Sequence, residues 1–406
     1  MVWVRPGMVL DAHVTLSSST WLIPIIVDNT HLTSPCPHLA FTLTTPQPLS
    51  PSAPPPAAPT SSSHTIPPPP KKNMPRTSDQ FSLPPNSSMP SNTPIDSDRV
   101  WTSLITNLNY LPALLTLNYS LRHRAKSSYP LLALYTDSFP EQGRSALARR
   151  DIPARRIPYL LPTESRDYSH DPRFYDCWSK LAPFSLTEFK RVVQLDADML
   201  VLRNMDELMT LALDQPPTEI GDAPSGNRVF AAGHACVCNP LRKSHYPSDW
   251  TPQNCAFSSQ HSDPEAAQTV APDPAVGPLG FMNGGLQVVN PSNVLYAQIV
   301  AHMEADAVNM DFADQSLLSD LYRGRWLPLP YVYNALKTMR WQGVHDAIWR
   351  DDEVKNVHYI LSPKPWDEMD QQGNWTGSDE THRWWVDVNR ERKAAEREQN
   401  IPDDGF

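Results

Sequence analysis

Proline is spread so unevenly along this chain that it limits where a core can form. Eighteen of the 44 prolines fall between Pro35 and Pro94, with uninterrupted runs at 54–56 and 67–70. Proline has no backbone N–H to donate, and this stretch has few large apolar side chains, so it cannot build a packed core. We therefore expect residues 1–97 to be mainly disordered. The remainder is long enough to bury a parallel sheet between helices on both faces.

The net charge of −10 at neutral pH argues against binding to nucleic acid or to anionic lipid, because no basic stripe offsets it. The longest early apolar run, Trp21 to Val27, is too short to span a membrane, because a spanning helix needs about 20 residues. Asp11 and His13 interrupt the apolar residues that a signal peptide would require. We expect a cytoplasmic protein without a membrane span. The oligomeric state is open, and a homodimer is one possibility.

Strand-like and helix-like segments alternate after residue 98, which predicts an α/β fold with a mostly parallel central sheet. Strands are expected at 100–106, 129–136, 157–161, 192–195, 286–289 and 357–360, and helices at 111–122, 141–150, 178–189, 205–213, 293–305, 314–322 and 381–399. The pattern is lost in an insertion at about 214–277, apart from a strand-like piece at 229–232. We therefore predict one domain over 98–375 and a helical tail over 376–406.

Asp196 and Asp198 stand in the middle of an apolar segment, which makes them the first candidates for chemistry. Residues i and i+2 of an extended segment point the same way, so both carboxylates can face one cation. Buried carboxylates are costly unless something compensates them, and hard oxygen ligands suit Mn²⁺ or Mg²⁺. A bare Asp-x-Asp is more often an ordinary pair of loop acids, but the buried setting favours a metal site.

His358 and Lys364 are the next candidates. A neutral imidazole at His358 could complete the coordination of the cation, and Lys364 could neutralise a phosphate oxygen. The alternatives are a histidine that is simply packed in the core or on the surface, and a solvated lysine.

Two further segments carry polar groups near expected element boundaries. Asp314, with Asp311 and Gln315 beside it, is either the N-cap of the next helix or a carboxylate that stabilises positive charge on a sugar. Asn283-Gly284-Gly285 either lets the backbone approach a ligand or forms a plain turn.

Three cysteines, Cys236, Cys238 and Cys255, lie in the insertion, with His234 and His245 nearby. Thiolates and imidazoles suit zinc, but the spacing matches no standard zinc module. Reduced thiols in a long insertion are the alternative, because five cysteines form no even disulfide framework.

These pieces, taken in order, resemble glycosyltransferase family 8, which includes glycogenin. The resemblance runs from about Val100 to Trp366 and implies a role for each motif. Leu104-Ile105-Thr106-Asn107 and Tyr110 would hold the uracil and ribose of a UDP-sugar, and Lys180 would lie near the donor sugar and phosphates. Asp196-Ala197-Asp198 and His358 would bind the metal, with Lys364 on the diphosphate. Asn283, Gly284 and Gly285 would contact the donor sugar, and Asp311, Asp314 and Gln315 the sugar and the acceptor side.

Three positions depart from the family pattern. Gly284 stands where serine or alanine is usual, and Leu361 where glycogenin has a glycine. Between Leu336 and Arg350 there is no tyrosine where animal glycogenins carry their self-glucosylated one, so self-glucosylation is not supported. The insertion and the tail resemble the fungal branch of the family.

The resemblance implies a GT-A, Rossmann-like fold and a retaining transfer of a hexose, glucose or galactose, from a UDP-sugar. Mn²⁺, or Mg²⁺ in its place, would be the cofactor, and the acceptor would be a hydroxyl of a small molecule, glycan or protein. Asp314, Gln315 and Lys180 would be the catalytic residues. Two rival interpretations are a galactinol-synthase-like transfer to inositol and a non-catalytic protein that keeps the fold as a scaffold.

Overall fold

The computed structural model describes residues 13–16, 19–22 and 95–406, except 220–225, 273–279 and 371. The chain divides into two compact units, Met1–Leu83 and Pro84–Phe406. In the first, β1 (His13–Leu16) pairs antiparallel with β2 (Ser19–Leu22). Most of the segment expected to be disordered lies outside the described residues.

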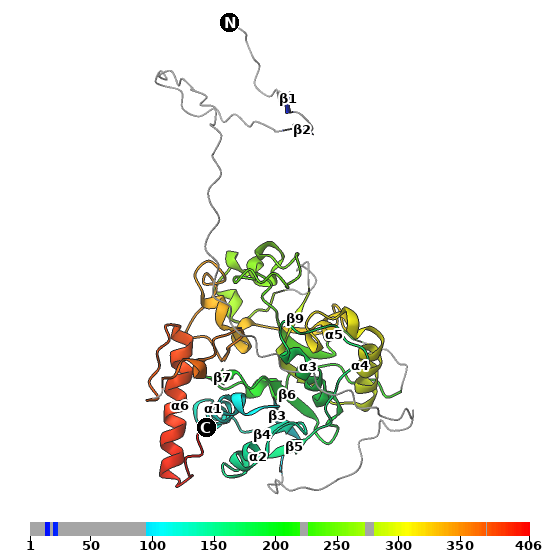
Figure 1. Ribbon diagram of the computed structural model, residues 1–406. Helices are drawn as coiled ribbons and strands as arrows, with labels where there is room; N and C mark the ends of the chain where they lie inside the picture. Colours follow the sequence, from blue (N-terminus) through cyan, green and yellow to red (C-terminus); the bar gives the residue numbers. More distant parts are fainter. Residues whose placement is uncertain (1–12, 17–18, 23–94, 220–225, 273–279, 371) are drawn as a thin grey trace, which may run out of the picture. The chain divides into compact units, whose positions relative to one another are not determined.

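A seven-stranded sheet forms the centre of the second unit (Figure 1). Its order is β10 (Leu327–Leu329), β8 (Phe230–His234), β9 (Met282–Val289), β6 (Arg191–Leu195), β3 (Arg99–Ile105), β4 (Leu131–Tyr135) and β5 (Ala154–Arg156). Only β9 runs antiparallel to its neighbours β6 and β8, and the other pairs are parallel. The predicted α/β class with a mostly parallel sheet is confirmed.

Both faces of the sheet are buried, as near-continuous apolar strands require. On one face, Val100, Leu132 and Val192 pack against α4 (Asn293–Asp306) and α5 (Asp314–Leu321). On the other, Trp101, Leu131 and Val193 pack against α1 (Leu111–Tyr119), and Ala133 packs near α2 (Glu141–Ala148). The side-chain alternation along each strand thus supplies two cores from one sheet.

A second, three-stranded sheet has the order β11 (Ala335–Leu336), β12 (Asn356–His358) and β7 (Met199–Val201). β12 is parallel to β11 and antiparallel to β7. Since β7 follows β6 after only three residues, the chain passes from the large sheet to the small one at Asp196-Ala197-Asp198.

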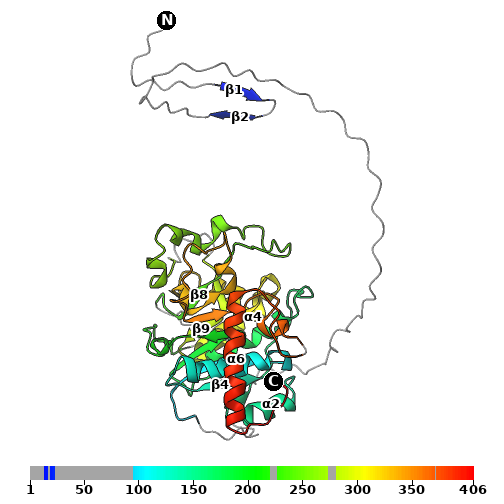
Figure 2. The same cartoon turned by 90° about the vertical axis from the view of Figure 1, so that its left-hand side faces the viewer.

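The last helix, α6 (Glu380–Glu398), runs along one side of the second unit (Figure 2). Its N-cap is Asp379, whose side chain accepts a hydrogen bond from the Thr381 N–H. Thr116 Oγ1 of α1 donates to Asn389 Oδ1 at 3.0 Å, and Trp385 is fully buried. Within the described residues, no helix has the length and apolarity that a membrane span requires.

Several elements differ from the pattern expected for their sequence. The strand expected at 157–161 is instead β5 and ends at Arg156, because Pro158 cannot donate to the sheet. The helix expected at 178–189 is a shorter 3₁₀ helix, η3 (Trp178–Ser185), with Pro183 inside it, and the short α3 (Arg173–Cys177) directly precedes it. The helix expected at 205–213 shortens to η4 (Asp206–Met209).

The remaining short helices connect these elements. They are η1 (Leu108–Tyr110), the π-helical turn η2 (Ser120–Arg124), η5 (Pro252–Asn254), η6 (Ala256–Ser262), η7 (Ala266–Gln268), η8 (Ala307–Asn309), η9 (Tyr331–Tyr333), η10 (Lys337–Arg340) and η11 (Pro365–Glu368). Three of them, η5 to η7, lie in the insertion, where the described residues otherwise have little regular structure.

Candidate active site

The two acids of the Asp-Ala-Asp segment lie in the turn that joins β6 to β7. The Asp196 N–H donates to the Gly285 carbonyl at 2.8 Å, and the Tyr359 N–H donates to the Asp198 carbonyl at 2.9 Å. These bonds fasten the turn to β9 on one side and to the end of β12 on the other. The segment was expected to be extended, so it is the turn, not strand alternation, that brings the carboxylates together.

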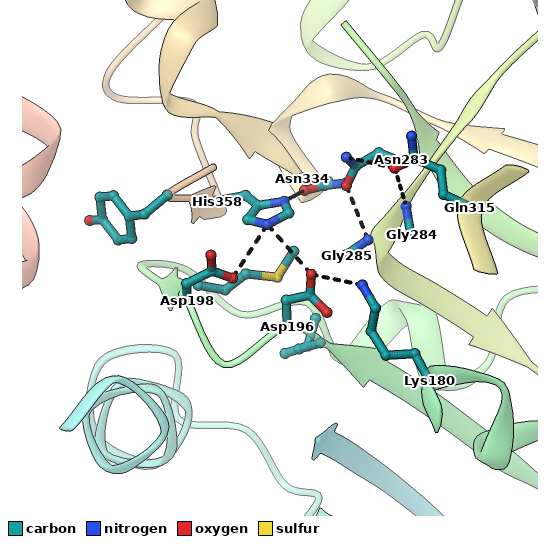
Figure 3. A network of polar contacts seen from close by, with 12 residues as sticks. Lys180, Asp196, Asp198, Asn283, Gly284, Gly285, Gln315, Asn334 and His358 are labelled. Carbon is teal, nitrogen blue, oxygen red and sulfur yellow. Dashed lines mark hydrogen bonds and ion pairs between the residues drawn. The ribbon is translucent and has the colours of Figure 1, made fainter. Parts of the chain in front are cut away.

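The carboxylates meet the imidazole of His358, which the register of β12 against β7 places opposite Met199. His358 Nε2 lies 3.4 Å from Asp198 Oδ1 and 3.7 Å from Asp196 Oδ2 (Figure 3). One ligand atom from each residue lies within 4.8 Å of the other two. Two carboxylate oxygens and one imidazole nitrogen form a donor set that fits a divalent cation such as Mn²⁺.

Asn334, which sequence reasoning missed, orients this imidazole. His358 Nδ1 lies 3.0 Å from Asn334 Oδ1, and the same amide donates through Nδ2 to Asn283 Oδ1 at 2.9 Å. The second bond fixes the amide orientation, so the Nδ1 hydrogen is donated to Asn334 and Nε2 is the nitrogen that faces the carboxylates. Asn334 follows η9 with no local pattern that would have marked it.

Lys180 lies between two carboxylates. Its Nζ is 3.2 Å from Asp196 Oδ2 and 3.9 Å from Asp314 Oδ2. Burial disfavours the ammonium, but the charges of Asp196 and Asp314 outweigh this and raise the Lys180 pKa well above its usual value. The lysine therefore carries a positive charge beside the proposed metal ligands.

Asp314 is the first residue of α5, not its N-cap. The capping position belongs to Ala313, whose φ is 46°. The carboxylate is 1% exposed, and Gln287 Nε2 donates to its Oδ2 at 3.3 Å. Burial raises the Asp314 pKa to about 7, and the neighbouring charge of Asp196 adds to the rise although Lys180 opposes it. Such a perturbed acid beside a cavity is typical of functional sites.

Asp314 does not line the cavity described below, and its carboxylate lies close to Gly284 of β9. A Cβ added at Gly284 would lie 2.6 Å from Asp314 Oδ2, and one added at Gly285 would lie 2.3 Å from His358 Cε1. Both glycines lie within β9, so the alternative of a plain turn is wrong. Their missing side chains leave room for the carboxylate and the imidazole.

Gln315 ties α5 to this strand. Its Oε1 accepts from the Gly284 N–H at 3.1 Å and from Asn283 Nδ2 at 3.3 Å (Figure 3). These bonds hold the Gln315 amide at the cavity wall.

Lys364 contacts the other carboxylate of the pair, Asp198. Its buried Nζ lies 2.5 Å from Asp198 Oδ2 and 2.5 Å from the Tyr359 carbonyl oxygen. Burial disfavours the Asp198 carboxylate, but Lys364 and His358 outweigh it and hold the Asp198 pKa well below its usual range.

A cavity of about 260 Å³ opens over these groups. Its lining includes most residues predicted for the site: Leu104, Ile105, Thr106, Asn107, Tyr110, Lys180, Asp196, Ala197, Asp198, Asn283, Gly285, Gln315, His358 and Lys364. Thr106 Oγ1 donates to Asp176 Oδ2 at 2.8 Å, and Arg173 donates to the Tyr110 hydroxyl at 3.1 Å. Asp176 and Arg173 also line the cavity and carried no recognisable motif.

The insertion forms another part of the wall, through Ala235, Cys236, Asn239, Pro240, Tyr246 and Trp250. Three predicted residues do not line the cavity. Gly284 and Asp314 are each adjacent in sequence to residues that line it. Asp311 lies apart: it pairs with Arg166 at 2.9 Å and borders a separate hollow beside Trp250 and Phe281.

The chain is similar to several known glycosyltransferases. The family model described as Glycosyl transferase family 8 matches residues 102–370. Galactinol synthase 1 of Ajuga reptans is 27% identical, over 74% of this chain and 84% of the relative. Galactinol synthase 4 of Arabidopsis thaliana is 26% identical, over 75% and 84%. Among solved structures, the glycosyltransferase GlyE of Streptococcus pneumoniae TIGR4 has a TM-score of 0.46 and 16% identity, over 75% of this chain and 64% of GlyE.

Proposed function

The chain belongs to glycosyltransferase family 8, and from this premise we propose that its cavity transfers glucose or galactose from UDP to a hydroxyl acceptor, with retention of the anomeric configuration. Membership of the family, together with the similarity to galactinol synthases, identifies the chain as a UDP-sugar hexosyltransferase. The observation that carries the finer proposal is the convergence of Asp196, Asp198 and His358 within 4.8 Å at the cavity floor.

The divalent cation would be bound by Asp196, Asp198 and His358. We propose Mn²⁺ as this cation, and Mg²⁺ is the alternative. When bound, the cation supplies Lewis-acid charge to the diphosphate. Lys364 lies against Asp198, so its ammonium can add a point charge for the diphosphate without crossing the cavity.

On the sugar side, Gln315 reaches the cavity whereas Asp314 does not. We assign Gln315 to direct contact with the sugar and Asp314, from its position beside Gly284, to stabilising positive charge at the anomeric carbon. The positive charge of Lys180 offsets the negative charges of Asp196 and Asp314, so these acids can lie close together when no substrate is bound.

A second candidate is galactosyl transfer to a cyclitol such as inositol. The specific support is the similarity over about three quarters of the chain to two galactinol synthases. A glucan acceptor has no comparable support.

The test incubates the full-length protein with UDP-glucose or UDP-galactose, each with Mn²⁺ and either inositol, a glucan or no acceptor. We expect metal-dependent release of UDP and an α-linked product from one acceptor. A β-linked product would contradict retention. A protein that releases no UDP from either donor and is not stabilised by UDP with Mn²⁺ would instead be a non-catalytic scaffold.

A further inference from the structure

Three thiols of the insertion converge with one imidazole from a later segment, and none of the four residues belongs to the proposed catalytic metal site. The residues are Cys236, Cys238, Cys255 and His345, and one ligand atom of each lies within 4.8 Å of the others. His345 Nε2 lies 3.3 Å from Cys238 Sγ and 3.3 Å from Cys255 Sγ. Tetrahedral zinc, with Zn–S of about 2.3 Å and Zn–N of about 2.0 Å, spaces its ligand atoms about 3.5–3.8 Å apart. The four side chains therefore need only small shifts to enclose such an ion.

His345 is arranged as a metal-binding histidine. Its ring is fully buried and packs edge-on against Phe257, with centroids 5.5 Å apart. Its second nitrogen, Nδ1, lies 2.9 Å from His261 Nε2. A proton on His345 Nδ1 can be donated to His261, which leaves the Nε2 lone pair facing the sulfur atoms. Metal-bound histidines commonly make this kind of outer bond.

The two histidines nearest in sequence to the first thiols lie elsewhere. His234 Nε2 lies 3.2 Å from the Pro272 carbonyl oxygen, and the His234 ring packs against Trp326. The His245 ring lies between His170 and Tyr246. The fourth ligand thus comes from a segment 90 residues beyond Cys255.

We propose that Cys236, Cys238, Cys255 and His345 bind one structural zinc ion that joins the insertion to the segment after η10. Three soft thiolates and one imidazole select zinc over Mn²⁺ or Mg²⁺, which prefer oxygen ligands. Binding releases three thiol protons and leaves His345 neutral. All four coordination positions come from the protein, which is typical of structural and not of catalytic zinc.

The position of this site gives it a consequence for the cavity. Cys236 lines the cavity itself, and Ala235, Asn239 and Pro240 beside it belong to the same wall. Cys255 and Phe257 pack in one cluster with Met339 and Ile348 from the other side of the site. A zinc ion there would hold this wall of the insertion in place, in a region with little regular structure of its own.

The test is the metal content of the full-length protein, purified without added metal and dialysed, by inductively coupled plasma mass spectrometry. We expect one zinc per chain in the wild type and at least about a tenfold loss in a Cys255→Ser/His345→Ala double variant. Cys177→Ser is a matched thiol control, and Asp198→Asn tests the other metal site. We expect both of these variants to keep their zinc. A wild type without zinc, or with iron in its place, overturns the proposal. So does zinc that is lost with Asp198→Asn and kept in the double variant.

A second measurement uses the wild-type protein, so it does not require any variant to fold. In the wild type, we expect Cys236, Cys238 and Cys255 to react with N-ethylmaleimide at least about tenfold faster after a zinc chelator is added, as mapped by mass spectrometry. Equal labelling rates with and without the chelator would show that no metal protects these thiols.

Discussion

His358 Nε2 lies 3.4 Å from Asp198 Oδ1 because β12 pairs antiparallel with β7 and sets His358 opposite Met199. The small sheet therefore builds the proposed metal site, while the large sheet supplies Asp196 at the end of β6. A substitution that slightly shifts one sheet relative to the other should therefore weaken metal binding even where the fold is kept.

The Asn334→Leu substitution removes the group that orients His358. The imidazole would lose the acceptor of its Nδ1 hydrogen, so we expect the Mn²⁺ concentration for half-maximal activity to rise by about 10–100-fold. At saturating Mn²⁺ the turnover number should return to near the wild-type value. A loss of turnover that saturating metal does not restore would contradict a positioning role.

The Gly285→Ala substitution should displace His358, since the new Cβ would lie 2.3 Å from its Cε1. We expect a loss of stability of about 1–3 kcal/mol, measured by urea unfolding without metal. In a His358→Ala background the space is free, so the same substitution should cost much less. An equal cost in both backgrounds would show that the clash is not with His358.

The Asp314→Asn substitution tests the proposed catalytic role of this carboxylate. Removing the carboxylate should lower the turnover number at least about 100-fold, because in the proposed mechanism its charge stabilises the transition state. The exposed Asp352→Asn is the matched control and should leave turnover unchanged. A variant of Asp314 with wild-type turnover would remove this residue from the mechanism.

The same variant has a defined pH dependence. Burial raises the Asp314 pKa to about 7, so the folded protein binds a proton that the unfolded chain releases above about pH 4. This contribution to stability is complete at low pH and is lost as the pH rises through 7. The melting temperature of Asp314→Asn relative to wild type should therefore increase between about pH 4 and pH 7, measured without metal. A constant difference would contradict the raised pKa.

Asp404 should show the opposite dependence. Burial disfavours its charge, but hydrogen bonds from Arg150 and Arg149 outweigh this and hold its pKa below the usual value. Its stabilisation is present above about pH 4 and is lost as the pH falls further. Asp404→Asn should cost about 1–3 kcal/mol at pH 7, and the difference should narrow in acid. Asp403→Asn, at the exposed neighbouring position, is the control for differential scanning fluorimetry.

The regular elements were predictable where one pattern dominates. β3, β6 and α4 follow from apolar runs and helical spacing, and the family resemblance is confirmed. The predicted roles of individual site residues stay predictions, although most of these residues line one cavity. Local patterns did not show that a turn joins Asp196 to Asp198, because apolar residues on both sides suggested a continuous strand.

Contacts between distant segments were not predictable from one sequence. Asn334 reaches His358 only because β11 and β12 are neighbours, and His345 reaches Cys255 across 90 residues. Asp311 stood beside Asp314 in the sequence, but the turn before α5 directs it to Arg166. In each case the position is set by packing between elements and not by spacing within one.

The most direct test of the central claim is calorimetric titration of UDP into the full-length protein, with and without Mn²⁺, for the wild type and for Asp198→Asn. We expect Mn²⁺ to strengthen UDP binding at least about tenfold in the wild type and to have little effect in the variant, because in the proposed site Asp196, Asp198 and His358 hold the cation against the diphosphate. UDP binding of equal strength with and without Mn²⁺, or an equal Mn²⁺ effect in both proteins, would contradict it.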